Sequence, residues 1–227
     1  MKNNGFTLAE VLITLGIIGV VASLTAPALT KNTGAAKIGP TLSKFVNTFE
    51  TATEQMMNEE GISKLSDAYT ASGSKTQLDV VLENLSNYLV MVPSDEKNYK
   101  FYAPGQNGVT NSGLTGKTIY ILKDGSMLGP HNSPLGGPLP AKGSYKGTLG
   151  VLVYDINGLK GKNKAGTEVF AFHLDDSGVL IPFGGQAEKY LRETNFATCD
   201  RTNKGQAQYG LACTGQIADN NYKYEDK

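Results

Sequence analysis

The length, composition and charge of the chain limit the classes of protein it can belong to. It has 227 residues, enough for one ordinary domain with an appendage but few for two full domains. Lysine and arginine total 21, as do aspartate and glutamate, so there is no net charge to hold a polyanion. This balance argues against a dedicated nucleic-acid-binding protein. Hydrophobic residues make up 40%, enough for a packed core, which excludes wholesale disorder.

A long apolar segment opens the chain. From Phe6 to Leu29, a run of 24 residues, the only ionisable side chain is that of Glu10. As a helix this run would be about 36 Å long, which exceeds the thickness of about 30 Å of a bilayer core. It is too long for the apolar part of a secretory signal peptide. It also differs from a plain membrane anchor, because a carboxylate inside the bilayer costs a few kcal/mol unless a cation pairs with it.

The residues around Glu10 suggest where that cation comes from. No lysine or arginine lies between Phe6 and Thr30, and a cut after Gly5 would create a free amino group that could serve. The short polar leader MKNNG is followed directly by FTLAEVLITLGIIGVVA. This arrangement resembles the processing and methylation motif of type IV pilins and type II secretion pseudopilins.

The resemblance implies a role for each residue of the motif. Prepilin peptidase would cut between Gly5 and Phe6 and methylate the new amino terminus of Phe6. Glu10 would pair with the terminal amine of a neighbouring subunit during assembly. In this family a glycine and a proline that match Gly19 and Pro27 bound a stretch that unwinds in the filament. A simple kink at Pro27, where the ring removes one helical hydrogen bond, is the alternative.

The resemblance also implies an α+β, pilin-like fold, in which a long N-terminal α-helix packs on a small antiparallel β-sheet head. The expected parts are a leader at 1–5, a transmembrane or filament-core helix at 6–29, the amphipathic second half of the helix at 30–60, and a globular α/β head at 61–227. An apolar stripe at helical spacing supports the second half: Leu42, Phe45, Val46, Phe49, Ala52 and Met56. Gly34 and the Gly39-Pro40 pair interrupt this pattern, so the helix either kinks there or restarts at Pro40.

The head sequence predicts one further helix and then strands. The segment from Leu78 to Met91 has one apolar face, and Thr76 with Asp79 predicts a capping box at its start. Beyond it, glycine-punctuated runs of β-branched and aromatic residues predict three to five antiparallel strands. These runs are 118–122 and 127–128, which form a hairpin, and 149–156, 169–174 and 179–183. The polar tail 220–227 is expected to be mobile.

Two features of the head could bind a ligand. Asp155 and Asn157 open a segment similar to the calcium loop that some pseudopilins carry, which makes them weak calcium candidates, with Asp175 or Asp176 as extra ligands. Lysines follow directly and repel a cation, so an Asn-Gly turn is the alternative. A basic patch for DNA, as in pilins that serve DNA uptake, or a solvated loop would explain five lysines: Lys142, Lys146, Lys160, Lys162 and Lys164.

Other chemistry is not expected. His131 and His173 have no cysteine or carboxylate at ligand spacing, so neither predicts a metal site. No catalytic motif is present, and we expect neither an enzyme nor a resident cofactor.

Two cysteines, Cys199 and Cys213, lie near the C-terminal end. Two cysteines are too few for a disulfide-stapled miniprotein, and they lack the additional ligands that a zinc site needs. Many pilins close a C-terminal loop with a disulfide, so the resemblance implies a bridge here if the head lies outside the cytoplasm, where thiols oxidise. A pair of free thiols is the alternative.

The sequence therefore predicts a structural subunit of a type IV pilus, a fimbrium, or of a type II secretion pseudopilus. The expected partners are other copies or related pilins, prepilin peptidase and the assembly platform in the membrane. The expected location is the cytoplasmic (inner) membrane, crossed once with the head outside the cytoplasm, and then a surface or periplasmic filament. The alternative is a membrane-anchored protein that binds DNA, a surface or a secreted substrate and never polymerises; it would have no use for Glu10.

Overall fold

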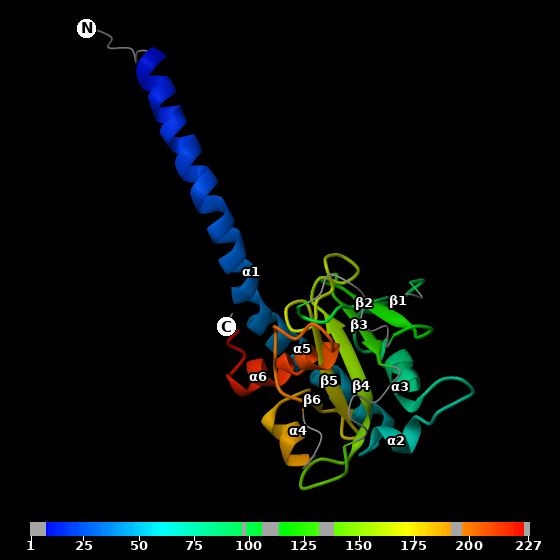
Figure 1. The fold of residues 1–227 in the computed structure, drawn as a ribbon. Coiled ribbons are helices and arrows are strands. Elements are labelled where there is room, and N and C mark those ends of the chain that lie inside the picture. Colours follow the sequence, from blue (N-terminus) through cyan, green and yellow to red (C-terminus); the bar gives the residue numbers. More distant parts are fainter. Residues whose placement is uncertain (1–7, 97–98, 106–113, 132–138, 192–196, 225–227) are drawn as a thin grey trace.

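The chain folds into one long helix and a compact α+β head (Figure 1). This computed structural model describes residues 8–96, 99–105, 114–131, 139–191 and 197–224, and only the backbone of residues 19–35. Helix α1, Leu8–Glu60, has 53 residues and is about 80 Å long. Its N-terminal half projects away from the head, and its C-terminal half packs on the sheet (Figure 1). Within the described residues, no helix combines the length and the apolar character that a membrane crossing requires.

Helix α1 continues through the glycines and prolines that interrupt its sequence pattern. It includes Gly34, Gly39 and Pro40 in one uninterrupted element, so a restart at Pro40, one of the two alternatives, is wrong. Proline inside a helix costs about 3 kcal/mol and glycine about 1 kcal/mol, so tertiary packing must offset these penalties. Ile38 and Leu42, on either side of the pair, are both buried in the core.

The head is built on a six-stranded antiparallel meander in which each strand pairs with the next in sequence. The strands are β1 Met91–Ser94, β2 Ile119–Leu122, β3 Met127–Pro130, β4 Thr148–Asp155, β5 Val169–Asp175 and β6 Leu180–Pro182. The predicted hairpin is β2–β3, in which Tyr120 pairs with Leu128. The sheet therefore has one strand more than the largest number predicted.

The extra strand lies where the sequence predicted the end of a helix. Helix α3, Gln77–Leu85, begins with the expected capping box of Thr76 and Asp79 but ends six residues before Met91. Met91 instead starts β1, which pairs with β2 at the edge of the sheet. Pro93 accounts for part of this error, because the residue before a proline avoids the α conformation and favours the extended one.

Two cores form on the two faces of the sheet. Alternate residues of β4 point to opposite sides, so that Leu152 and Tyr154 join one core while Val151 and Val153 join the other. Helices α1 and α3 cover the first face, and the predicted stripe of α1 from Leu42 to Met56 is buried there. Phe45 stacks on Tyr154 with 3.9 Å between ring centroids. The second face is covered by α5, Ala207–Leu211, and by the segment 99–101.

The remaining helices are short. They are α2 Leu65–Ala68, α4 Gln186–Leu191 and α6 Cys213–Asp219. Helix α6 adds Ile217 to the core that α1 covers. Helix α6 therefore lies against the long helix.

Candidate functional site

The projecting half of α1 is apolar and exposed. Seven large apolar side chains between residues 8 and 18 are 43–81% exposed: Leu8, Val11, Leu12, Ile13, Leu15, Ile17 and Ile18. They lie all around the helix rather than in one stripe, and no part of the described head covers them. A helix that is apolar on every side is stable when it is surrounded by lipid or by other helices. This half of α1 is therefore the strongest candidate for an interaction site.

Glu10 interrupts this apolar surface in the first turn of α1. Its side chain is exposed, and its backbone carbonyl accepts a hydrogen bond from the Thr14 hydroxyl at 2.9 Å. A carboxylate near a helix N-terminus is favoured by the helix dipole. The predicted cleavage residues, Gly5 and Phe6, lie outside the described residues. Gly19 and Pro27 lie inside the continuous α1, and their unwinding or kinking in a filament stays a prediction.

The neck, where α1 enters the head, is held by the C-terminal tail. A Cβ atom on Gly39 would lie 1.6 Å from the carbonyl oxygen of Tyr222, so only glycine permits this contact. Asn221 and Tyr222 adopt φ angles of 51° and 56°, and this left-handed turn directs the chain from α6 back toward α1. The expectation of a mobile tail is wrong as far as Tyr224, which packs on the core beside α1.

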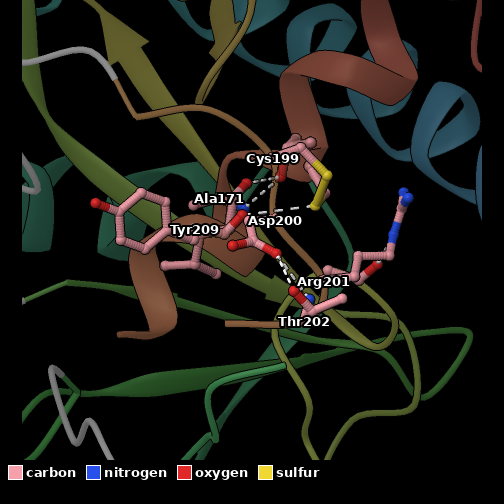
Figure 2. The surroundings of a disulfide bond; sticks show 10 residues. Ala171, Cys199, Asp200, Arg201, Thr202 and Tyr209 are labelled. Carbon is pink, nitrogen blue, oxygen red and sulfur yellow. Dashed lines mark hydrogen bonds between the residues drawn. A yellow bond between two sulfur atoms is a disulfide. The ribbon is translucent and has the colours of Figure 1, made fainter. Parts of the chain in front are cut away.

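The predicted disulfide is present. Cys199 and Cys213 are bonded, which joins the loop before α5 to the start of α6 (Figure 2). Within the loop, the Asp200 carboxylate accepts hydrogen bonds from the hydroxyl and the backbone N–H of Thr202, at 2.7 and 2.9 Å. These bonds lower the pKa of Asp200. The guanidinium of Arg201 lies 4.7 Å from the ring centroid of Tyr224, so the disulfide loop also contacts the tail.

The structure places the extra ligands suggested for the weak calcium site far from Asp155. Asp155 ends β4, whereas Asp175 pairs with Thr148 at the opposite end of that strand, about 23 Å away at the usual rise per residue. Neither Asp175 nor its neighbour Asp176 can therefore join Asp155 and Asn157 around one ion. Among the described residues, no three histidine, cysteine, aspartate or glutamate side chains are grouped so that they could hold a metal.

Asp155 instead forms a buried pair with a tyrosine. Its carboxylate accepts a hydrogen bond of 2.6 Å from the Tyr99 hydroxyl and one of 2.8 Å from the backbone N–H of Asn157. The Asn157 contact is an Asx turn made by the Asp155 side chain, and the N–H of Gly158 donates to the Asp155 carbonyl at 3.3 Å, which closes the Asn-Gly turn given as the alternative. Burial raises the pKa of Asp155 to about 7, although these hydrogen bonds oppose the shift. Burial and the nearby carboxylate also raise the pKa of Tyr99.

The five lysines of the predicted basic patch do not lie together. Lys146 belongs to the loop before β4, where its backbone N–H donates to Asp175, and Lys142 is close by, over the ring of Tyr190. The other three lysines, at positions 160, 162 and 164, follow the far end of β4. The prediction that these five lysines form a single patch is therefore wrong.

Both histidines are buried. His173 Nε2 lies 3.2 Å from the Glu188 carboxylate, and both side chains are 1% exposed. Glu188 in turn accepts a hydrogen bond from the backbone N–H of Gly184 at 2.6 Å. This pair connects β5 to α4. His131 is 9% exposed and lies beside the ring of Phe101.

Sequence comparison identifies the amino-terminal segment. Residues 1–26 match the family model of the prokaryotic N-terminal methylation motif. No curated protein and no solved structure matches the chain. The match includes Gly5, Phe6 and Glu10, and it ends within the first half of α1. The chain therefore carries the prepilin-type motif of type IV pilins and pseudopilins at its amino terminus.

Proposed function

We propose that the chain is a structural subunit of a type IV pilus or of a type II secretion pseudopilus, made as a precursor, cut after Gly5 and methylated on Phe6. One observation carries the proposal. The methylation motif leads directly into a helix whose apolar side chains project, exposed, from a folded head. This arrangement supports a subunit that assembles through its helix and displays its head.

The energetics support a membrane stage followed by assembly. Burial of one Leu, Ile or Val side chain stabilises by about 1.5–3 kcal/mol, so seven exposed ones together make the free helix strongly unfavourable in water. Lipid would cover them first, in a single crossing of the inner membrane with the head outside the cytoplasm. Helices of neighbouring subunits would cover them in the filament.

Glu10 gives this assembly a defined register. A carboxylate surrounded by apolar helices needs a cationic partner, and the methylated amine of Phe6 on a neighbouring subunit would provide it. The pair would fix the axial offset between adjacent helices. The partners are thus related subunits, prepilin peptidase and the assembly platform, and the role is structural rather than catalytic.

Glu10→Ala tests the proposal in the native host. We expect a variant that is cleaved and resident in the membrane but absent from sheared filaments. Glu54→Ala, which removes an exposed carboxylate from the head-bound half of the same helix, is the matched control and should be incorporated normally. Incorporation of the Glu10 variant at the parental level would refute the role of Glu10. Parent protein that is cleaved but never found in filaments would favour the membrane-anchored binding protein.

A further inference from the structure

Three loops that are distant in sequence meet at one end of the sheet. The Asn163 side chain donates to the carbonyl of Lys100 at 3.1 Å, and Tyr102 forms a bridge with Lys164, which joins segment 99–105 to the β4–β5 loop. The disulfide loop completes the group, because Lys204 packs against Gly105. We call the six cationic side chains of these loops the basic end: Lys100, Lys160, Lys162, Lys164, Arg201 and Lys204.

The described parts of these loops carry more positive than negative charge. Within the described parts of these loops, two carboxylates outside the core, those of Glu168 and Asp200, stand against the six cationic side chains. Glu168 accepts from the backbone N–H groups of Lys162 and Lys164, at 3.0 and 3.2 Å, and Asp200 accepts from Thr202. Among the described residues, none of the five lysines has a carboxylate within salt-bridge distance. The chain as a whole is neutral, so this positive charge is a local feature of one end of the head.

This end faces the direction in which α1 projects. Residues 44 and 45 of α1 contact the end of β4 and the β2–β3 turn, through the Lys44–Asp124 pair at 3.9 Å and the stacking of Phe45 on Tyr154. Glu50 and Thr53, further along α1, bind the β5–β6 turn at Leu180 and Gly178. Strand β4 therefore runs toward the free half of α1, and the β4–β5 loop (yellow) lies at that end in Figure 1.

The basic end lies close enough to the expected membrane surface for electrostatic attraction to act across the gap. Arg201 stacks on Tyr224, two residues from the Tyr222 contact with Gly39, so the basic end lies near the level of Gly39. Ten helical residues separate Gly39 from the end of the apolar run at Leu29, which is about 15 Å. The headgroup layer occupies about 5–7 Å of this distance on one side of the bilayer. The remaining gap is close to the Debye length of about 8–10 Å at physiological salt.

We propose that the basic end binds the anionic phospholipid headgroups of the membrane in which α1 is inserted, and so holds the head against the membrane before assembly. The inference rests on the proposed function, because the membrane position of α1 supplies the orientation. Attraction between a basic segment and anionic lipid falls off within a Debye length, so this surface acts at the membrane from which α1 emerges and not at a distance.

A single tryptophan can report this contact, because the chain contains none. Leu159 is 47% exposed and precedes the lysines of the β4–β5 loop, so Leu159→Trp places the probe in the basic end. The full-length variant is added in detergent to preformed vesicles, and the detergent is removed. Quenching of the tryptophan by a lipid with a nitroxide headgroup is then compared between phosphatidylcholine vesicles and vesicles with equal parts of phosphatidylglycerol. We expect stronger quenching with the anionic lipid, and loss of the difference at high salt.

Charge variants that carry the same Leu159→Trp probe test which lysines bind the anionic lipid. Replacement of Lys160, Lys162 and Lys204 by glutamine should lower the membrane-docked population by about tenfold, since each cation near an anionic surface contributes about fivefold before screening. The matched control replaces Lys64, Lys146 and Lys189, three exposed lysines away from the basic end, and should leave the quenching unchanged. Circular dichroism of each variant verifies the fold.

The outcomes separate the two proposals. Failure of the parent chain to float with vesicles of either composition would contradict membrane insertion and thus the proposed function. Flotation with both, but equal quenching in neutral and anionic vesicles, would overturn the role of the basic end alone. Equal quenching together with a tryptophan response to a short DNA duplex would assign the surface to a soluble polyanion instead, and would also overturn the proposal.

Discussion

The buried Asp155 carboxyl predicts an unusual dependence of stability on pH. Burial raises its pKa from 3.8 to about 7 in the folded chain. Between about pH 4 and pH 7 the folded state therefore keeps a proton that the unfolded chain has released. Because the folded state binds more protons in this range, the free energy of unfolding falls as pH rises. The shift of about three units corresponds to about 4 kcal/mol lost by pH 8.

The substitution Asp155→Asn should remove this fall in the free energy of unfolding at higher pH. The amide is neutral at every pH, its oxygen can accept from the Asn157 N–H, and its NH₂ group can donate to the Tyr99 oxygen. We expect the free energy of unfolding of the variant, relative to the parent, to rise by about 4 kcal/mol between pH 4 and pH 8. The comparison cancels the contributions of other titrating groups, because they are common to both chains.

The assay is urea unfolding of the full chain in a neutral detergent, followed by tyrosine fluorescence at several pH values. Asp67→Asn, which neutralises an exposed carboxylate in α2, controls for the loss of one charge. A constant difference in unfolding free energy between the Asp155 variant and the parent from pH 4 to pH 8 would show that folding does not shift the pKa of this carboxyl, which would contradict the prediction.

Three further predictions concern the neck, the disulfide and the leader. Gly39→Ala should detach the tail from α1, because the added methyl group would collide with Tyr222. Tryptic cleavage of the tail should then accelerate. The control Gly16→Ala, whose added methyl group would meet no atom within 4 Å, should leave the rate of tail cleavage unchanged. Replacing both cysteines by serine should lower the free energy of unfolding in urea by about 3 kcal/mol, and a loss below about 1 kcal/mol would mean that other contacts hold the loop. Gly5→Ala should leave most chains uncleaved on a mass spectrum, with the thermal unfolding of the head unchanged; normal processing would show that the peptidase does not require this glycine.

Local sequence patterns predicted much of the fold correctly. The apolar stripe of α1 and the capping box at Thr76 arise from contacts within a few residues of each other, so spacing alone identifies them. The β2–β3 hairpin follows from a short turn sequence at Lys123, Asp124 and Gly125 for the same reason. The predicted disulfide rested on family resemblance, and it is present.

Features made by distant segments were missed. Nothing near Gly39 in sequence indicates that Tyr222 fills the space of its absent side chain. Tyrosines in the polar tail were the available signal, since large aromatic side chains tend to bury their rings. The Tyr99–Asp155 pair and the basic end likewise depend on loops that only the tertiary fold brings together.

The extra ligands suggested for the weak calcium site were wrong for a related reason. Asp155 and Asp175 are the last residues of two adjacent strands. Because these strands are antiparallel, their last residues lie at opposite ends of the strand pair. Within the described residues the expected long helix is present from Leu8 onward, while its place in a membrane or a filament depends on surroundings that a single chain does not contain.

Intact mass and amino-terminal sequencing of the protein extracted from its native membrane would show whether the chain is processed as a prepilin. We expect a chain that begins at Phe6, has 222 residues after loss of the first five, and carries one added methyl group on its amino terminus. A chain that still begins at Met1, with no added methyl group, would contradict processing through the prepilin pathway and favour the anchored binding protein.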